Sequence, residues 1–144
     1  MSAPAMSDPF DVLAIAADIR QGRRSAVSVM TETIAAMQVR DTSINSVTRI
    51  FGPRAVGEAE RIDRRLAAGD DPGPLAGVPF GVKDLFDVAG EVTTAGSVVL
   101  RESPPAAHDA TVVARLRAAG AGPGAPRYLA EFADGLATAH APYR

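Results

Sequence analysis

The chain has 144 residues, of which 47% are hydrophobic and 22% charged, as expected for one folded domain rather than a disordered segment. A net charge of −2 gives no basic field for nucleic acid or an anionic membrane surface, and the apolar runs are too short to span a membrane. The sequence has no cysteine, which excludes disulfides and a cysteine nucleophile, and no signal-like opening, so a cytoplasmic location is expected.

The first part of the chain, residues 8–68, is predicted to be a helical lead-in. Asp8 and Pro9 offer an N-cap and a first-turn proline for a first helix, which Gly22 ends. Ser25 then caps a second helix, whose apolar side chains recur at the spacing of one helix face. We expect this stripe to be core: Val27, Met30, Ile34 and Met37.

A strand and a third helix complete the lead-in. The β-branched segment 45–51 predicts the strand, and Pro53 begins a helix that Gly69 ends. The side chains expected to point inward are Ala55, Ala59, Ile62 and Leu66. The charged side chains expected to be mostly solvated are Glu58, Glu60, Arg61, Asp63, Arg64 and Arg65.

A turn-forming connector at 69–74 leads into the most apolar part of the chain. Residues 75–82 predict a short strand that is buried on both faces. Lys83 and Asp84 follow where this strand should end, and residues 90–97 (GEVTTAGS) predict a loop.

A fourth helix is predicted after an extended connector at 103–107. Asp109 is the expected N-cap and Gly120 the expected end, with an apolar side formed by Val112, Val113, Leu116 and Ala119. His108 and His140 share no spacing that suggests a zinc site with a carboxylate, so we expect both to be exposed and no metal to be bound. Helices that lead into a buried apolar strand and then another helix predict an α/β layer fold.

Lys83 is the only lysine in the chain, beside fourteen arginines. Lysine can lose its proton where its surroundings disfavour the charge, whereas arginine cannot. In α/β proteins, functional groups gather at the carboxyl ends of buried strands, which is the predicted place of Lys83. Two interpretations remain open from the residues alone: a desolvated lysine that acts as a base, and a surface pair of Lys83 with Asp84.

Three blocks occur in order between residues 73 and 121: GVPFGVKD, TTAGS and DATVVARLRAAGA. They resemble the amidase signature family, whose members carry G-x-P-x-x-x-K-D, a T-T-A-G-S loop and D-A-x-x-V-x-x-L-x-x-A-G-A. The resemblance implies an α/β/α layer fold with a mixed sheet, of which this chain is the amino-terminal portion. We expect a single, incomplete domain over 1–144: a helical lead-in (8–68), a lysine-bearing core segment (69–121) and a divergent tail (122–144).

Members of this family hydrolyse amide C–N bonds with a lysine, a serine in a cis peptide and a nucleophilic serine. The resemblance implies that Lys83 takes the proton of the nucleophile through the bridging serine and returns it to the leaving amine. In the family both serines lie in a Gly/Ser-rich segment further along the chain, and these 144 residues contain no such run. A small-molecule amide is the implied substrate, and no metal or organic cofactor is implied.

Local residues offer one alternative nucleophile. The resemblance places Thr93, Thr94 and Ser97 in a loop near the active site, where we expect them to form hydrogen bonds within the loop. The alternative is a Ser97–Lys83 dyad.

Three hypotheses for the whole chain follow. It is an amidase segment that is inactive alone, a non-catalytic binding or dimerisation module, or one half of a split amidase completed by a serine-bearing chain. Because the predicted sheet is unfinished, we expect self-association or pairing with a serine-bearing amidase segment.

Residues 122–130 (GPGAPRYLA) depart from the family pattern, which has an apolar strand here. Two glycines and two prolines predict an irregular segment instead. The pattern resumes with Glu131 and Phe132, followed by Gly135, Thr138 and Tyr143.

Overall fold

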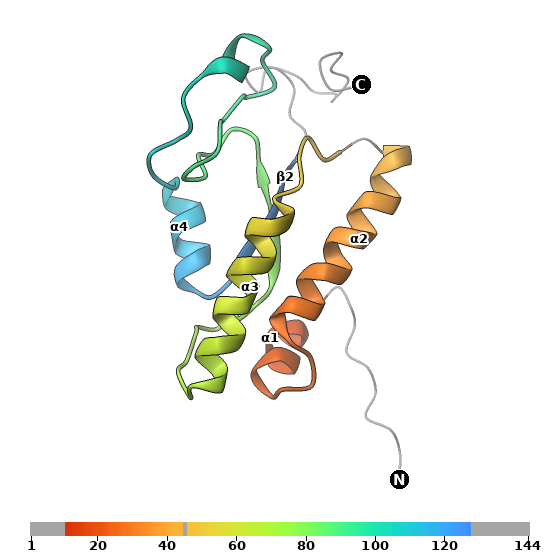
Figure 1. Cartoon of the computed structure of the whole chain (residues 1–144), viewed down its shortest axis with the longest axis vertical. Helices are drawn as coiled ribbons and strands as arrows, with labels where there is room; N and C mark the ends of the chain where they lie inside the picture. Colours follow the sequence, from red (N-terminus) through yellow and green to blue (C-terminus); the bar gives the residue numbers. More distant parts are fainter. Residues whose placement is uncertain (1–10, 45, 128–144) are drawn as a thin grey trace.

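The computed structural model describes residues 11–44 and 46–127, and within these ranges it is an α/β fold with a helical lead-in, as expected. No helix in these ranges is long and apolar enough to cross a bilayer. In Figure 1 the helix α3 lies in front of the two strands, with α2 on one side and α4 on the other. The elements in chain order are α1 (Val12–Arg20), α2 (Ala26–Ile44), α3 (Gly52–Ala67), β1 (Pro79–Lys83), η1 (Val99–Glu102), α4 (Thr111–Ala118) and β2 (Gly122–Arg127).

The N-cap of α1 is Asp11, whose side chain accepts the N–H groups of Leu13 at 2.9 Å and Ala14 at 3.2 Å. The cap predicted at Asp8 and Pro9 lies outside the described residues. Gly22 follows the helix with a φ of +69°, a conformation that glycine adopts at no steric cost, so the predicted end of the first helix is confirmed.

Two side chains cap α2. Ser25 accepts the N–H of Ser28 at 3.0 Å, as predicted. The carboxylate of Asp63, in α3, accepts the N–H groups of Ala26 at 2.7 Å and Val27 at 3.1 Å. The prediction that Asp63 is solvated is therefore wrong, because the unpaired N–H groups and partial positive charge at a helix N-terminus bind a carboxylate.

The segment predicted as a strand at 45–51 is extended but forms no regular strand in its described part. Val47 makes an isolated bridge, and the N–H of Phe51 donates to the carbonyl of Gly124 at 3.1 Å. The carboxylate of Asp41 accepts the N–H groups of Ser46 at 2.6 Å and Val47 at 3.0 Å. The prediction is wrong because a side chain takes the donors that a strand ladder would need.

The strand β1 starts four residues later than the predicted strand, because residues 74–77 form a turn. It ends at Lys83, as predicted. Burial on both faces was predicted wrongly: Val82 is buried, whereas Gly81 and Lys83 are exposed. The described part of the chain supplies only one neighbouring strand and covers one face.

Residues 122–127 form β2, which pairs in parallel with β1. The prediction of an irregular segment is therefore wrong for these residues, and 128–130 lie outside the described ones. Gly122 packs closely against α2, since a Cβ at this position would lie 3.1 Å from the Cε of Met30. The ladder has a register shift between Phe80 and Gly81, at the position of Gly124 in β2. The paired positions are Pro79–Gly122, Phe80–Pro123, Gly81–Ala125, Val82–Pro126 and Lys83–Arg127.

The predicted cap of the fourth helix has another role. Asp109 accepts the N–H of Ala89 at 2.7 Å, and its second oxygen lies 3.2 Å from Nε of Arg117, while the N-cap position is taken by Ala110 without a side-chain bond. Arg117 also lies 3.3 Å from Glu58, which is therefore not solvated as predicted. The half-buried guanidinium of Arg117 thus lies beside both carboxylates as an opposite charge.

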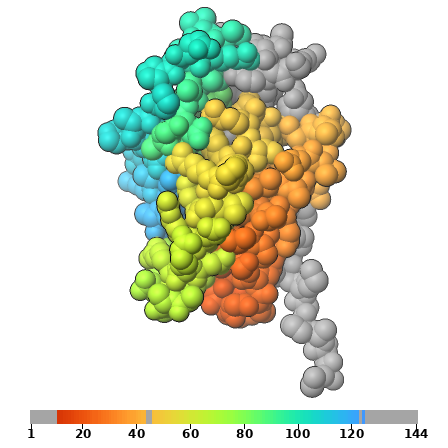
Figure 2. Space-filling model, in the orientation of Figure 1, coloured from red at the N-terminus to blue at the C-terminus, as the bar shows by residue number. Residues whose placement is uncertain are grey.

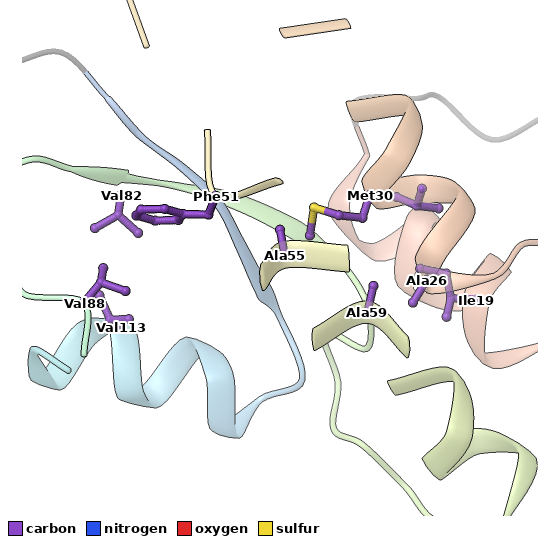
Figure 3. Packing of buried hydrophobic residues seen from close by; sticks show 10 residues of the cluster. Ile19, Ala26, Met30, Phe51, Ala55, Ala59, Val82, Val88 and Val113 are labelled. Carbon is purple, nitrogen blue, oxygen red and sulfur yellow. The ribbon is translucent and has the colours of Figure 1, made fainter. Parts of the chain in front are cut away.

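The hydrophobic core lies between the helices and β1 (Figure 3). Met30, Ala26 and Ile19 face Ala55 and Ala59, two small residues of α3 that let the helices approach closely. A second group lies between β1 and α4 and comprises Phe51, Val82, Val88 and Val113. Figure 2 shows α3 between the surface of α2 and that of α4, so this face of the sheet is covered by helices.

Candidate active site

Lys83 is the last residue of β1, and its side chain is exposed. Its carbonyl accepts the N–H groups of Leu85 at 2.7 Å and Phe86 at 3.0 Å, which turns the chain sharply after the strand. The burial that would favour a neutral amine is therefore not supplied by residues 11–44 and 46–127. The alternative surface pair is also absent in that part of the chain, because Asp84 turns inward and is only 7% exposed.

The carboxylates of Asp84 and Asp87 hold the loop that follows. Asp84 accepts the backbone N–H of Thr94 at 3.1 Å and also its hydroxyl. Asp87 accepts the hydroxyl of Thr93 at 2.6 Å. From the sequence, Asp84 was considered only as a surface partner of Lys83. The sequence signal that could have shown this loop-holding role is the presence of two aspartates, Asp84 and Asp87, shortly before the adjacent Thr93 and Thr94.

Ser97 is fully buried within the same loop. Its N–H donates to the carbonyl of Thr94 at 2.7 Å, and its Oγ accepts the N–H of Val99 at 3.3 Å. Ala95 and Gly96 between them have φ values of +48° and +73°, which closes a tight turn. A buried hydroxyl engaged in this way does not reach a substrate, so the geometry favours the role within the loop over the Ser97–Lys83 dyad.

Residues 89–91 lie in the sequence between Lys83 and the loop at 93–97 and are attached to α3. The guanidinium of Arg54 donates to the carbonyl of Ala89 at 2.6 Å and lies 3.4 Å from Glu91. Glu91 is also paired with Arg49 at 2.9 Å, and Asp109 holds the N–H of Ala89. Charged side chains thus hold residues 89–91, which lead into the loop at 93–97.

A groove of about 720 Å³ lies elsewhere, between α1, α2 and the strands. Its described lining includes Gly81 but neither Lys83 nor the loop at 93–97. Most of the side chains that line it are apolar, among them Val12, Ile15, Val29, Met37, Val78 and Phe80. The groove is suited to an apolar partner surface rather than to the proton transfers of a catalytic centre.

Metal chemistry has no candidate site in the described ranges. His108 is exposed, as predicted, and His140 lies outside the described residues. No group of three or more histidine, aspartate or glutamate side chains in residues 11–44 and 46–127 is arranged to hold a metal ion.

Comparison with known proteins gives one consistent family. The family model described as Amidase matches residues 28–144. AtzE, the 1-carboxybiuret hydrolase subunit of Pseudomonas sp. (strain ADP), is 44% identical over 125 residues, which are 87% of this chain and 27% of that protein. A glutamyl-tRNA(Gln) amidotransferase subunit of Bdellovibrio bacteriovorus is 44% identical over 96 residues, 67% of this chain and 19% of that protein.

A solved structure has the same fold. It is described as a vestigial protein complex that reveals the evolutionary origins of an s-triazine catabolic enzyme, and it matches with a TM-score of 0.89 and 42% identity. The match covers 93% of this chain and 29% of the solved one. The chain therefore spans about a quarter of the length of the relatives it matches.

Proposed function

The chain belongs to the amidase signature family, and on this premise we propose that it is the lysine-bearing segment of an enzyme that hydrolyses amide C–N bonds. Lys83 is the proposed catalytic base. The observation that carries the proposal is the position of this single lysine, at the carboxyl end of β1 and next to the anchored loop at 93–97.

In this proposal Lys83 in its neutral form accepts a proton through a bridging serine from the nucleophilic serine. The serine oxygen then forms a bond to the amide carbon, the C–N bond breaks, and the proton passes to the leaving amine. Water hydrolyses the resulting ester and regenerates the serine. Both serines belong to polypeptide outside these 144 residues, so the chain alone is proposed to be inactive.

The exposure of Lys83 supports a need for a second segment. A lysine works as a base near neutral pH where apolar surroundings disfavour its charge, and residues 11–44 and 46–127 leave this side chain in solvent. We propose that a serine-bearing amidase segment covers it and packs into the apolar groove beside β1. This segment would correspond to the three quarters of the relatives' length that this chain does not match.

The proposed substrate is a small molecule that carries an amide bond. The relatives named above differ in what their names say they act on. We therefore propose only the amide bond for this chain and none of the individual substrates. The polar contacts that select a substrate would come from the segment that carries the serines.

A complementation assay tests this function. The chain and a serine-bearing segment of the 44% identical 1-carboxybiuret hydrolase subunit would be expressed separately and together, and release of ammonia from primary amides measured. We expect turnover from the mixture and none from either part. Turnover by the highly purified chain alone, abolished by Lys83→Ala, would contradict the proposal and support a dyad with Ser97.

A further inference from the structure

Neighbouring side chains at the end of β1 point to opposite sides. Lys83 is exposed, whereas Asp84 is buried, although the two are adjacent in the sequence. Within a strand, successive side chains point to opposite sides. This geometry does not by itself keep the carboxylate away from the amine, because Asp84 follows the strand's last residue and begins a turn.

The inward position of Asp84 is held by Thr94. Both oxygens of the carboxylate are engaged there, one by the backbone N–H at 3.1 Å and the other by the hydroxyl. Hydrogen bonds to an ionised carboxylate are about twice as strong as those between neutral groups. The two hydrogen bonds from Thr94 offset part of the free energy that is needed to bury the charge of Asp84 without a cation beside it.

A released carboxylate would affect Lys83 directly. A carboxylate next to an ammonium group favours the charged form and so opposes the role of a lysine as a base or nucleophile. No ion pair joins Lys83 to any acidic side chain in the described ranges. The exposed Asp87 is likewise engaged, by the hydroxyl of Thr93.

We propose that Asp84 is a positioning residue and that Thr94 keeps its carboxylate turned away from Lys83. The loop at 93–97 thereby controls the reactivity of the amine. The purpose of this effect on Lys83 rests on the proposed function. The effect itself is a property of the described chain, and the reactivity of the amine can be measured without amidase activity.

The single lysine makes the test direct. The full chain is treated with an amine-acylating reagent at one mildly alkaline pH, and the rate of acylation at Lys83 is followed by mass spectrometry. Cleavage after arginine places Lys83 in the peptide 66–101, which separates it from the α-amino group. Circular dichroism of each variant shows whether it is folded.

Thr94→Val removes the hydroxyl that holds one carboxylate oxygen. We expect acylation of Lys83 to slow by about two- to fivefold, the range typical of an exposed ion pair. Adding Asp84→Asn to this variant should restore the rate, because no charge is left to pair with the amine. The control Thr42→Val removes an exposed hydroxyl of α2, which donates to the carbonyl of Val39 at 2.8 Å and holds no carboxylate, and should leave the rate unchanged.

Asp84→Asn alone gives a second measurement if Thr94→Val does not fold. It keeps acceptor capacity toward Thr94, and we expect a rate equal to that of the unaltered chain. A several-fold rise would show that Asp84 already pairs with Lys83, and it would overturn the proposal. An unchanged rate in folded Thr94→Val, or a reduced rate that Asp84→Asn does not restore, would also overturn it. The absence of amidase activity in a completed enzyme would count against the proposed function and leave these rates unaffected.

Discussion

The N–H of Gly77 donates to the carbonyl oxygen of Gly120 at 2.9 Å, which joins the turn before β1 to the end of α4. Both glycines have positive φ values, +71° and +91°. The N–H of Leu75 donates to Ala119 at 2.8 Å in the same contact. This junction sets the start of β1 beside the start of β2, and β1 in turn places Lys83 at its other end.

Gly77→Ala should destabilise the chain severely. An added Cβ would lie 2.6 Å from the Cβ of Ala26 and 2.8 Å from the Cδ1 of Ile19, both in the core. The control is Gly22→Ala, which has a similar φ of +69° but nothing within 4 Å, so it meets only the backbone strain of about 1–2 kcal/mol. We expect Gly77→Ala to cost about 1–3 kcal/mol more in urea denaturation. Equal losses would contradict the close approach.

Asp63→Ala should remove the cap that α3 provides to α2. A lost N-cap costs about 0.5–2 kcal/mol of the free energy of unfolding. Glu60→Ala is the matched control on the same helix, because Glu60 makes only an exposed pair with Arg64 at 3.6 Å and should change stability by less than about 0.5 kcal/mol. The comparison uses thermal unfolding, and equal effects of the two substitutions would show that the cap contributes nothing.

The sequence predicted the helices well because their signals are local. Ser25 caps α2 as expected, and Gly22, Gly69 and Gly120 follow their helices with positive φ. The end of β1 at Lys83 was also predicted correctly, since a charged pair follows an apolar run.

Most of the errors lie where a distant segment decides the structure. Gly and Pro predicted an irregular segment at 122–127, but this segment pairs with β1, and Gly122 lies close to Met30 of α2. Asp63 and Asp109 have partners in other elements that no local pattern shows. At the site, the loop near Lys83 was predicted, but its attachment through Asp84 was not. The catalytic role of Lys83 itself is still a prediction.

The carboxyl of Asp71 should titrate below its ordinary range. The N–H of Gly73, at 3.0 Å, lowers the pKa of this carboxyl, and Arg20, at 3.2 Å, lowers it further. Because the pKa is lower in the folded chain, the stabilisation is present above the unfolded value and is lost as the pH falls through the folded one.

Carboxyl-detected NMR of the chain measures this pKa. In Arg20→Gln part of the lowering should persist, because the backbone donor, the largest single cause, remains. A return to the ordinary value in that variant would mean that the arginine, not the N–H of Gly73, dominates.

The apolar groove between α1, α2 and the strands should make the purified chain self-associate. Its apolar lining has about 720 Å³ of open space beside it, and burial of apolar surface favours association. Sedimentation velocity over a wide range of concentration should show oligomers that Met37→Glu, within the lining, weakens. Leu13→Glu is the control, since Leu13 is 70% exposed but is not among the described lining residues. A monomer at all concentrations would contradict this prediction.

The most direct test of the catalytic assignment is Lys83→Arg in the chain complemented with a serine-bearing segment. Arginine keeps the positive charge but does not give up its proton, so the substitution removes the base function alone. We expect the complex to form as before and amide turnover to fall by about 10³-fold or more, as when a member of a serine triad is lost. Turnover that stays within about tenfold of the unaltered complex would show that Lys83 is not the catalytic base.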